Sequence, residues 1–258
     1  METTNIATQG KPVLLKVRIY APSPCTVSLI GIDPSKPNST YFNRGYGDSK
    51  NPFYGAKEFY FPMPISPYNL KFIVKPSDPE CVIEIKDYKV VPLDQVKLYL
   101  KPDEQAFLEF AVEFVVKAGS LSQGMYENED EKNKFYINYL NDIVDYKTKR
   151  SENTPARISR ATGYIEINRS KFINYAIPVR LIMLLHEFMH WRLKTRIELE
   201  CDYNALNIWL KLGGSSTQAL TAFTKVFHDK EHLIERTEKI SEFIRNFEKK
   251  YPNLNSEK

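Results

Sequence analysis

The spacing of apolar residues changes near residue 100, and no other feature of the sequence limits the fold as strongly. Before this point, apolar residues alternate with polar ones in short runs that end at Pro- and Asn-rich turns. After it, apolar residues recur at the spacing of helices that bury one face. The chain has 258 residues, more than the usual domain size of about 100–200 residues. We therefore predict an α+β protein with two domains, residues 1–100 and residues 101–258.

Residues 1–100 are predicted to form an antiparallel β-sandwich domain with a binding or structural role. Short β-rich runs separated by turn signals are typical of such domains. The stretch 34–55 is rich in Asn, Ser, Gly, Pro and Tyr, which predicts a long surface loop. The expected strands cover 13–19, 26–32, 58–63, 70–75 and 81–91.

Residues 101–258 are predicted to be mainly helical, with one small β element. Phe107, Phe110 and Phe114 follow helical spacing, and Gly119 is a good stop signal. A β-hairpin is expected from two short runs around Gly163. The hairpin strands cover 157–159 and 164–168, and the expected helices cover 107–118, 135–144, 178–193, 197–212, 216–227 and 231–249.

Composition and charge exclude several classes of protein. The net charge is +4 with scattered Lys and Arg residues, so no basic face for nucleic acid is evident. No run approaches the roughly 18 apolar residues that cross a bilayer, and the polar start lacks the pattern of a secretory signal. Cys25, Cys81 and Cys201 are few and widely spaced, which indicates reduced, buried thiols. We expect a cytoplasmic protein, or one within a virus particle, that binds neither nucleic acid nor membrane.

The sequence His186-Glu-Phe-Met-His190 lies in the most apolar predicted helix. Two histidines four positions apart share one helix face, so both imidazoles can bind one metal ion. Zinc suits such a site because it accepts nitrogen and oxygen ligands and leaves a position for water. Glu187 can then take a proton from that water as it attacks a carbonyl. Chance occurrence is the alternative, but a buried helix needs a reason for three polar side chains.

The next predicted helix offers a third ligand. Glu198 and Asp202 lie four positions apart on one face, whereas Glu200 points elsewhere. Glu198 would complete a set of two histidines and a glutamate, and Asp202 would accept a hydrogen bond from a ligating histidine. A solvated acidic helix start is the other reading of these carboxylates.

HEFMH followed by ELECDYNAL resembles the gluzincin clan of zinc metallopeptidases, whose motif is HExxH followed by ExxxD. The resemblance covers about residues 101–250 and implies a compact, soluble zincin domain. It implies His186, His190 and Glu198 as ligands of one zinc ion per chain, Glu187 as the base and Asp202 as the partner of a ligand. It also implies that the strand at 163–168 is an edge strand that pairs with substrate. Only seven residues separate His190 from Glu198, which is close to the compact forms, including peptidases that cleave phage repressors.

The predicted function is zinc-dependent hydrolysis of a peptide or protein substrate. The main alternative is a non-enzymatic protein, such as a phage particle component, in which zinc joins helices and the β domain binds a partner. A deformylase would draw a Cys ligand from the strand before the motif, where neither Cys25 nor Cys81 lies. Metzincins need HExxHxxGxxH, which Leu193 and Arg196 break.

Several other residues are open candidates. His228 and His232 are four apart, but Asp229-Lys230 predicts a turn between them, so a surface pair or an oxyanion donor are both open. Tyr164, Tyr203 and Arg236 are comparable candidates for that donor. The two tryptophans are expected to be packing residues. The aromatic stretch from Tyr41 to Tyr60 is expected in the core, with a protein or glycan partner as the functional reading.

Overall fold

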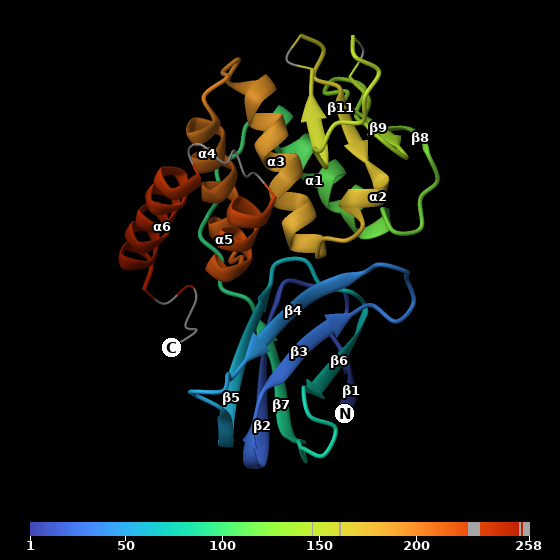
Figure 1. Cartoon of the computed structure of the whole chain (residues 1–258). Helices are drawn as coiled ribbons and strands as arrows, with labels where there is room; N and C mark the ends of the chain where they lie inside the picture. The colour runs from blue at the N-terminus through green and yellow to red at the C-terminus, as the bar shows by residue number, and fades with distance from the viewer. Residues whose placement is uncertain (146, 160, 227–232, 253, 255–258) are drawn as a thin grey trace.

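The computed structural model describes residues 1–145, 147–159, 161–226, 233–252 and 254. Its N-terminal part consists of strands, and its C-terminal part consists of helices beside a second β element (Figure 1). The predicted α+β class is therefore confirmed. In the part of the chain that the structure describes, no helix combines the length and apolar character needed to span a bilayer.

Two antiparallel sheets make up the N-terminal part. Four strands are arranged in the order β1-β6-β3-β4, and three in the order β5-β2-β7. The strands are β1 (Glu2–Ala7), β2 (Val13–Cys25), β3 (Val27–Ile32), β4 (Thr40–Tyr46), β5 (Phe53–Met63), β6 (Asn69–Pro76) and β7 (Glu84–Pro92). All five predicted strands are present.

Aromatic side chains join the buried faces of these two sheets. In β2, buried apolar residues alternate with more exposed polar ones, as one-sided burial requires. Phe42 of β4 stacks on Phe61 of β5 with ring centroids 4.3 Å apart, and Phe61 meets Phe72 of β6 at 5.5 Å. The aromatic stretch is thus mostly core, as expected, although Tyr54 is 67% exposed.

Two N-terminal expectations are corrected. The stretch 34–55, predicted as a long loop, contains β4 and the start of β5. β4 escapes a period-two reading because its buried residues, Tyr41 and Phe42, are consecutive. β1 was missed because only Ile6 is buried, so backbone pairing with β6 holds a largely polar strand.

The expectation that all three cysteines are buried holds for two of them. Cys25 and Cys201 are buried, but Cys81 is partly exposed. Burial, followed by the neighbouring Cys81 thiol, raises the pKa of Cys25. Cys25 and Cys81 are therefore neighbours in the fold although they lie far apart in the sequence.

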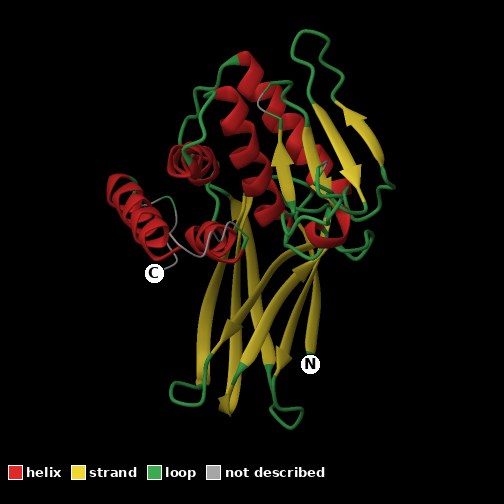
Figure 2. Cartoon of the chain, turned by 45° about the horizontal axis from the view of Figure 1, so that its top comes forward, coloured by secondary structure: helices red, strands yellow, loops and turns green. Residues whose placement is uncertain are grey.

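The C-terminal part combines helices with a four-stranded sheet, which lies to one side of the longer helices (Figure 2). Its strands have the order β10-β11-β9-β8, and β9 and β11 are parallel. They are β8 (Gly124–Glu127), β9 (Tyr136–Leu140), β10 (Ala156–Ile158) and β11 (Ile165–Asn168). The helices are α1 (Pro102–Lys117), α2 (Arg169–Phe172), α3 (Ile177–Arg192), α4 (Glu198–Lys211), α5 (Ser216–Lys225) and α6 (Leu233–Lys250). Residues 227 and 231–232, at the ends of two predicted helices, lie outside the described residues.

Two expectations about this sheet are wrong. Residues 135–144, predicted as a helix, contain β9, in which Ile137 and Tyr139 are buried on alternate positions. Pairing with β8 and β11 on its two sides overrides the ambiguous local pattern. The hairpin of β10 and β11 is confirmed, but among the described strands β10 lies at an edge of the sheet and β11 lies inside it.

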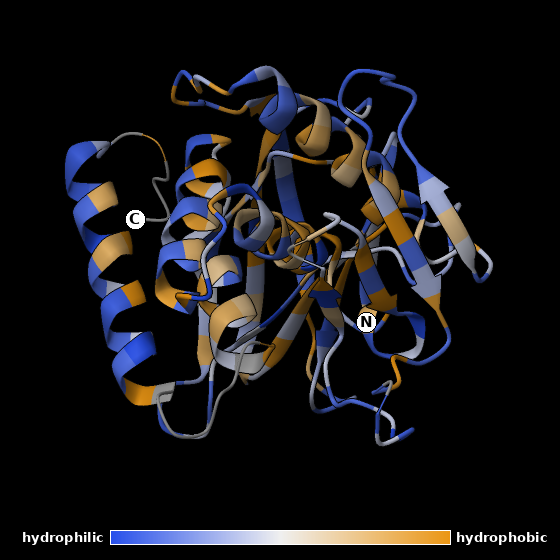
Figure 3. Cartoon of the chain, turned by 90° about the horizontal axis from the view of Figure 1, so that it is seen from above, coloured by the Kyte–Doolittle hydropathy of each residue, from blue (hydrophilic) through white to orange (hydrophobic). Residues whose placement is uncertain are grey.

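Helix α3 lies in the middle of the C-terminal part. It contacts α1, α4, α5 and β10, and also β4 of the N-terminal part. Hydrophobic residues gather around the centre of the molecule, whereas the outer helix α6 alternates hydrophilic and hydrophobic residues along its length (Figure 3). Ile240, Ile244 and Phe247 form the buried side of α6.

Arg180 anchors the first turns of α3 and connects the two parts of the chain. Its side chain is 1% exposed and donates to the carbonyls of Tyr175 at 2.8 Å and Ile173 at 2.7 Å. It also donates to the carbonyl of Asn38, in the turn between β3 and β4. Burial lowers the pKa of Arg180 to about 10, so the guanidinium stays charged near neutral pH. These hydrogen bonds fix the start of α3 relative to both the N-terminal and the C-terminal part.

Replacing Arg180 with Met should destabilise the protein by about 3 kcal/mol or more, because the buried guanidinium and its hydrogen bonds to several backbone carbonyls are lost. Urea unfolding monitored by circular dichroism measures this change. Arg245→Met, at an exposed position of α6, is the control and should stay within about 0.5 kcal/mol of the parent. Equal stability of the two variants would contradict the anchoring role.

Candidate metal centre

The motif helix α3 is buried along most of its length. Residues 177–190 are all buried, and Pro178 stands in the first turn, where its missing N–H costs nothing. His186 is 1% exposed and His190 7% exposed. One helical turn separates them, and their ring centroids lie 4.7 Å apart. The sequence has therefore placed two imidazoles on one face of a helix that solvent barely reaches.

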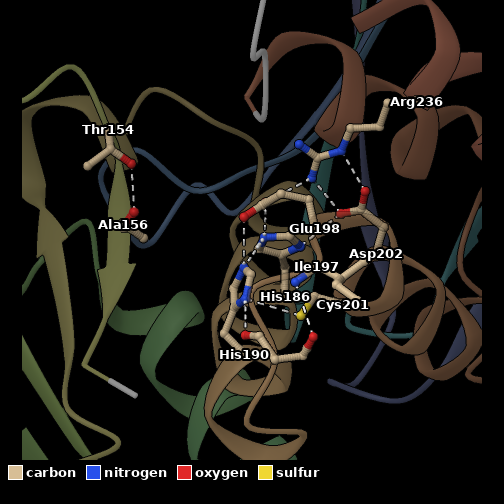
Figure 4. Close-up of polar contacts among 10 residues, drawn as sticks. Thr154, Ala156, His186, His190, Ile197, Glu198, Cys201, Asp202 and Arg236 are labelled. Atoms are coloured by element: carbon tan, nitrogen blue, oxygen red, sulfur yellow. Dashed lines mark hydrogen bonds and ion pairs between the residues drawn. The ribbon is translucent and has the colours of Figure 1, made fainter. Parts of the chain in front are cut away.

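A tight reversal after α3 brings the third candidate ligand to these imidazoles. The helix ends at Arg192, and Lys194 adopts the left-handed conformation with φ of 54°. Helix α4 then begins at Glu198 and packs against α3. Figure 4 shows the Glu198 carboxylate turned toward the two imidazoles. Glu198 keeps 53% of its side chain exposed, so this side of the site faces solvent.

The three donor atoms have the spacing of a zinc site. His186 Nε2 and His190 Nε2 lie 3.1 Å apart; Glu198 Oε2 lies 3.2 Å from His186 Nε2, and the other carboxylate oxygen, Oε1, lies 3.3 Å from His190 Nε2. Ligands at about 2.0–2.1 Å from one ion in tetrahedral geometry lie about 3.3 Å from each other. His186, His190 and Glu198 could therefore hold a metal ion, and their nitrogen and oxygen donors suit zinc.

Asp202 and Arg236 form a charged pair behind His186. Asp202 is fully buried, and its Oδ1 lies 2.8 Å from His186 Nδ1. Arg236 of α6 donates from Nε and Nη2 to the two Asp202 oxygens at 2.6 and 2.7 Å. Its Nη2 is also 3.4 Å from Glu198. A carboxylate at Nδ1 leaves Nε2 of His186 as the donor for a metal, and Arg236 fixes that carboxylate.

His190 is oriented by groups that the sequence analysis missed. Its Nδ1 lies 3.1 Å from the Thr195 carbonyl and 3.3 Å from Cys201 Sγ. A backbone carbonyl in a turn carries no side-chain signature, so its role cannot be read from the sequence. Cys201 precedes Asp202 in the ExxxD segment. Its position three residues after Glu198 on the same helix is the only sign in the sequence that its thiol lies near the site. Both contacts leave Nε2 of His190 directed at His186 and Glu198.

Glu187 occupies a buried position beside the edge strand of the sheet. Only 8% of the residue is exposed. Burial raises the pKa of Glu187 to about 7, although His186, His190 and a hydrogen bond from the Ile158 backbone oppose the rise. Ile158 ends β10, which contacts α3. The sequence analysis did not foresee this bond. A carboxyl group whose pKa lies near neutrality can exchange protons at physiological pH.

The candidate ligands His186 and Glu198 shift each other's pKa. Burial alone would lower the pKa of His186, but hydrogen bonds to Asp202 and Glu198 outweigh it and raise the pKa to about 9. Burial alone would raise the pKa of Glu198. His186 and His190 outweigh this effect and hold the pKa of Glu198 far below its usual range. Both shifts agree with the short distances between the Glu198 carboxylate and the two imidazoles.

The remaining predicted residues are dispersed. Glu200 is exposed on α4, away from the donors. Tyr203 stacks on Phe243 at 5.0 Å, and Tyr164 is 41% exposed beside Tyr136. The hydrogen bonds of Arg236 to Asp202 mark it as a positioning residue.

Outside this neighbourhood, the two tryptophans behave as expected and the two remaining histidines cannot be placed. Trp209 is fully buried, and Trp191 packs on Phe135 and Phe188. His228 and His232 lie outside the described residues, so the structure places neither.

Comparison of the chain with models of protein families, with curated proteins and with solved structures finds no match.

Proposed function

We propose that this protein is a zinc-dependent metallopeptidase of the gluzincin type. The observation that carries the proposal is the convergence of His186, His190 and Glu198 at tetrahedral spacing, with Glu187 directly beside the first ligand. When bound, a zinc ion would supply Lewis acidity, polarising a peptide carbonyl and lowering the pKa of a water molecule.

Each residue has a distinct role in the proposed reaction. His186, His190 and Glu198 hold the metal, and Asp202 with Arg236 fixes the ring of His186. Glu187 accepts a proton from the attacking water and passes it to the leaving nitrogen. Its burial and its pKa of about 7 support this role, because a general base works best near the ambient pH.

The edge strand β10 is the proposed support for the substrate backbone. Among the strands that the structure describes, β10 pairs with β11 alone, and an extended peptide can add to an edge strand of a sheet. The hydrogen bond from Ile158 to Glu187 ties the end of this strand to the proposed base. A peptide aligned along β10 would therefore run toward the metal ligands.

For the N-terminal part we propose an antiparallel β-sandwich domain within residues 1–100, followed by a minimal zincin domain in residues 101–258. The aromatic contacts between the two sheets support the sandwich. We propose a binding or structural role for it, with a protein or glycan as partner. Exposed tyrosines such as Tyr54 and Tyr68, 67% and 70% exposed, are side chains of the kind that contact such partners.

A structural zinc site is the second candidate function, because the same three donors join α3 to α4. In this alternative the protein is non-enzymatic and zinc only stabilises the helices. The buried Glu187 favours the enzyme, since a purely structural site needs no carboxylate with a raised pKa next to a ligand.

Metal removal distinguishes the two functions. The purified chain is incubated with a proteome-derived peptide library, and new termini are identified by mass spectrometry. We expect cleavage that stops with 1,10-phenanthroline and returns with one equivalent of Zn²⁺ but not of Mg²⁺. A chelator that lowers Tm while no library peptide is cut, before or after zinc addition, would contradict the peptidase and favour the structural site.

A further inference from the structure

A second surface of the C-terminal part has the features of a binding site and lies at the opposite edge of its sheet from β10. A hollow of about 480 Å³ opens between α1 and the strand β8. Because the strand order is β10-β11-β9-β8, two strands separate β8 from the strand next to Glu187. The hollow falls within the range of about 300–1,000 Å³ that ligand sites in proteins occupy.

The floor of this hollow is apolar. Phe110 and Phe114 of α1 line it and are 8% and 3% exposed. Tyr126 of β8 packs edge-on against Phe114 with ring centroids 5.7 Å apart, and Leu121 completes this side. Such a floor can cover one or two apolar side chains of a partner.

The rim of the hollow is negatively charged although the whole chain carries a net charge of +4. Five carboxylates and one ammonium group line it: Glu109, Glu113, Glu127, Glu129, Asp130 and Lys117. Glu113 pairs with Lys117 at 2.5 Å, and Glu127 lies 3.7 Å from Lys134, but the side chains of Glu113, Lys117 and Glu127 are all more than half exposed. Exposed ion pairs of this kind contribute little to stability, so these carboxylates can pair with the cation of a ligand instead. A concentration of acidic groups on a basic protein therefore favours a cationic ligand at this place.

The exposed edge of β8 is the third feature of the proposed binding site, after the floor and the rim of the hollow. Among the strands that the structure describes, β8 pairs with β9 and forms the outer edge of the sheet. An edge strand exposes backbone N–H and C=O groups that can pair with an added strand. Side chains of an added strand alternate in direction, so every second one would face the hollow behind β8.

We propose that the hollow binds a basic, partly apolar segment of another protein, added as a strand beside β8. Alternate apolar side chains occupy the floor formed by Phe110, Phe114 and Tyr126. Lys or Arg side chains of the same segment pair with the carboxylates of the rim. This binding is independent of the proposed hydrolysis, because it uses the opposite edge of the sheet and none of the metal ligands.

Fluorescence anisotropy with labelled octapeptides tests the proposal. An alternating Lys–Leu peptide should bind the full chain at least tenfold more tightly than alternating Lys–Ser or Glu–Leu peptides, since only it matches both floor and rim. The rim variant Glu113→Gln/Glu129→Gln should bind it about three- to tenfold more weakly. The variant Ala106→Phe, which fills the hollow without changing charge, should also weaken binding.

A matched control separates this site from general electrostatics. Glu80→Gln/Glu84→Gln removes the same charge from exposed positions of the N-terminal part, and Glu84 is likewise paired with a lysine, Lys86. This variant should bind the Lys–Leu peptide as the parent does. Equal weakening in the control and rim variants, equal affinity for the Lys–Ser peptide, or no binding of the Lys–Leu peptide would each overturn the proposal.

Discussion

Glu187→Gln should lose at least about a hundredfold of peptide hydrolysis, the lower limit for loss of a general base, while zinc stays bound. Glutamine keeps the size of the side chain but cannot accept a proton from water. The metal donors His186, His190 and Glu198 are unchanged, so metal content measured by mass spectrometry should stay at one zinc per chain. Neutralising a buried carboxylate should leave Tm unchanged or raised, because burial already disfavours its charged form.

The control for this variant is Glu200→Gln, the same chemical change at an exposed position of α4. It should keep full activity and full metal content. Hydrolysis that persists in Glu187→Gln, on a substrate whose cleavage needs zinc, would contradict the proposed mechanism. Loss of zinc in that variant would instead assign Glu187 to the metal ligands.

The candidate site was predictable from the sequence to the extent that helical periodicity determines it. Positions four apart on a helix share a face, so HExxH and ExxxD predict which side chains can meet. The structure brings His186, His190, Glu198 and Asp202 together as that geometry requires. The contact of Arg236 with Asp202 depends on how α6 docks, and no local pattern encodes such packing.

The groups that orient His190 and Glu187 could not be predicted from the sequence. His190 is oriented by the carbonyl of Thr195 and the thiol of Cys201, and Glu187 by a backbone N–H of β10. Backbone groups are the same in every residue, so only the path of the chain determines where they point. The sequence therefore predicts the candidate metal donors better than the groups that orient them.

The errors in the fold have a related cause. Residues 135–144 have apolar positions that suit either a helix or a strand, and the partners on both sides of β9 decide the outcome. β4 and β1 were missed because strand pairing, and not their own pattern, holds them. The helices from α3 onward were predicted closely because long amphipathic or apolar runs allow only one assignment.

The metal ligands should show a graded series of losses. The double variant His186→Ala/His190→Ala should bind no zinc, because one carboxylate remains of three donors. Glu198→Ala should weaken zinc affinity and activity together. Asp202→Asn should reduce affinity or activity about 10–100-fold, as is typical when the partner of a ligand is lost. Competition with a fluorescent chelator measures the affinities, and library cleavage measures the activities.

The pairing of Asp202 with Arg236 adds a second expectation for Asp202→Asn. Asp202 is the closer of the two carboxylates that contact the buried guanidinium of Arg236, so removing its charge should also lower Tm, whereas Glu198→Ala should not lower it as much. Glu200→Ala should change neither zinc affinity nor Tm. If Glu200→Ala removed the zinc while Glu198→Ala retained it, the third ligand would be misassigned. Full zinc occupancy in the double histidine variant would overturn the site assignment, because the metal would then be held without either imidazole.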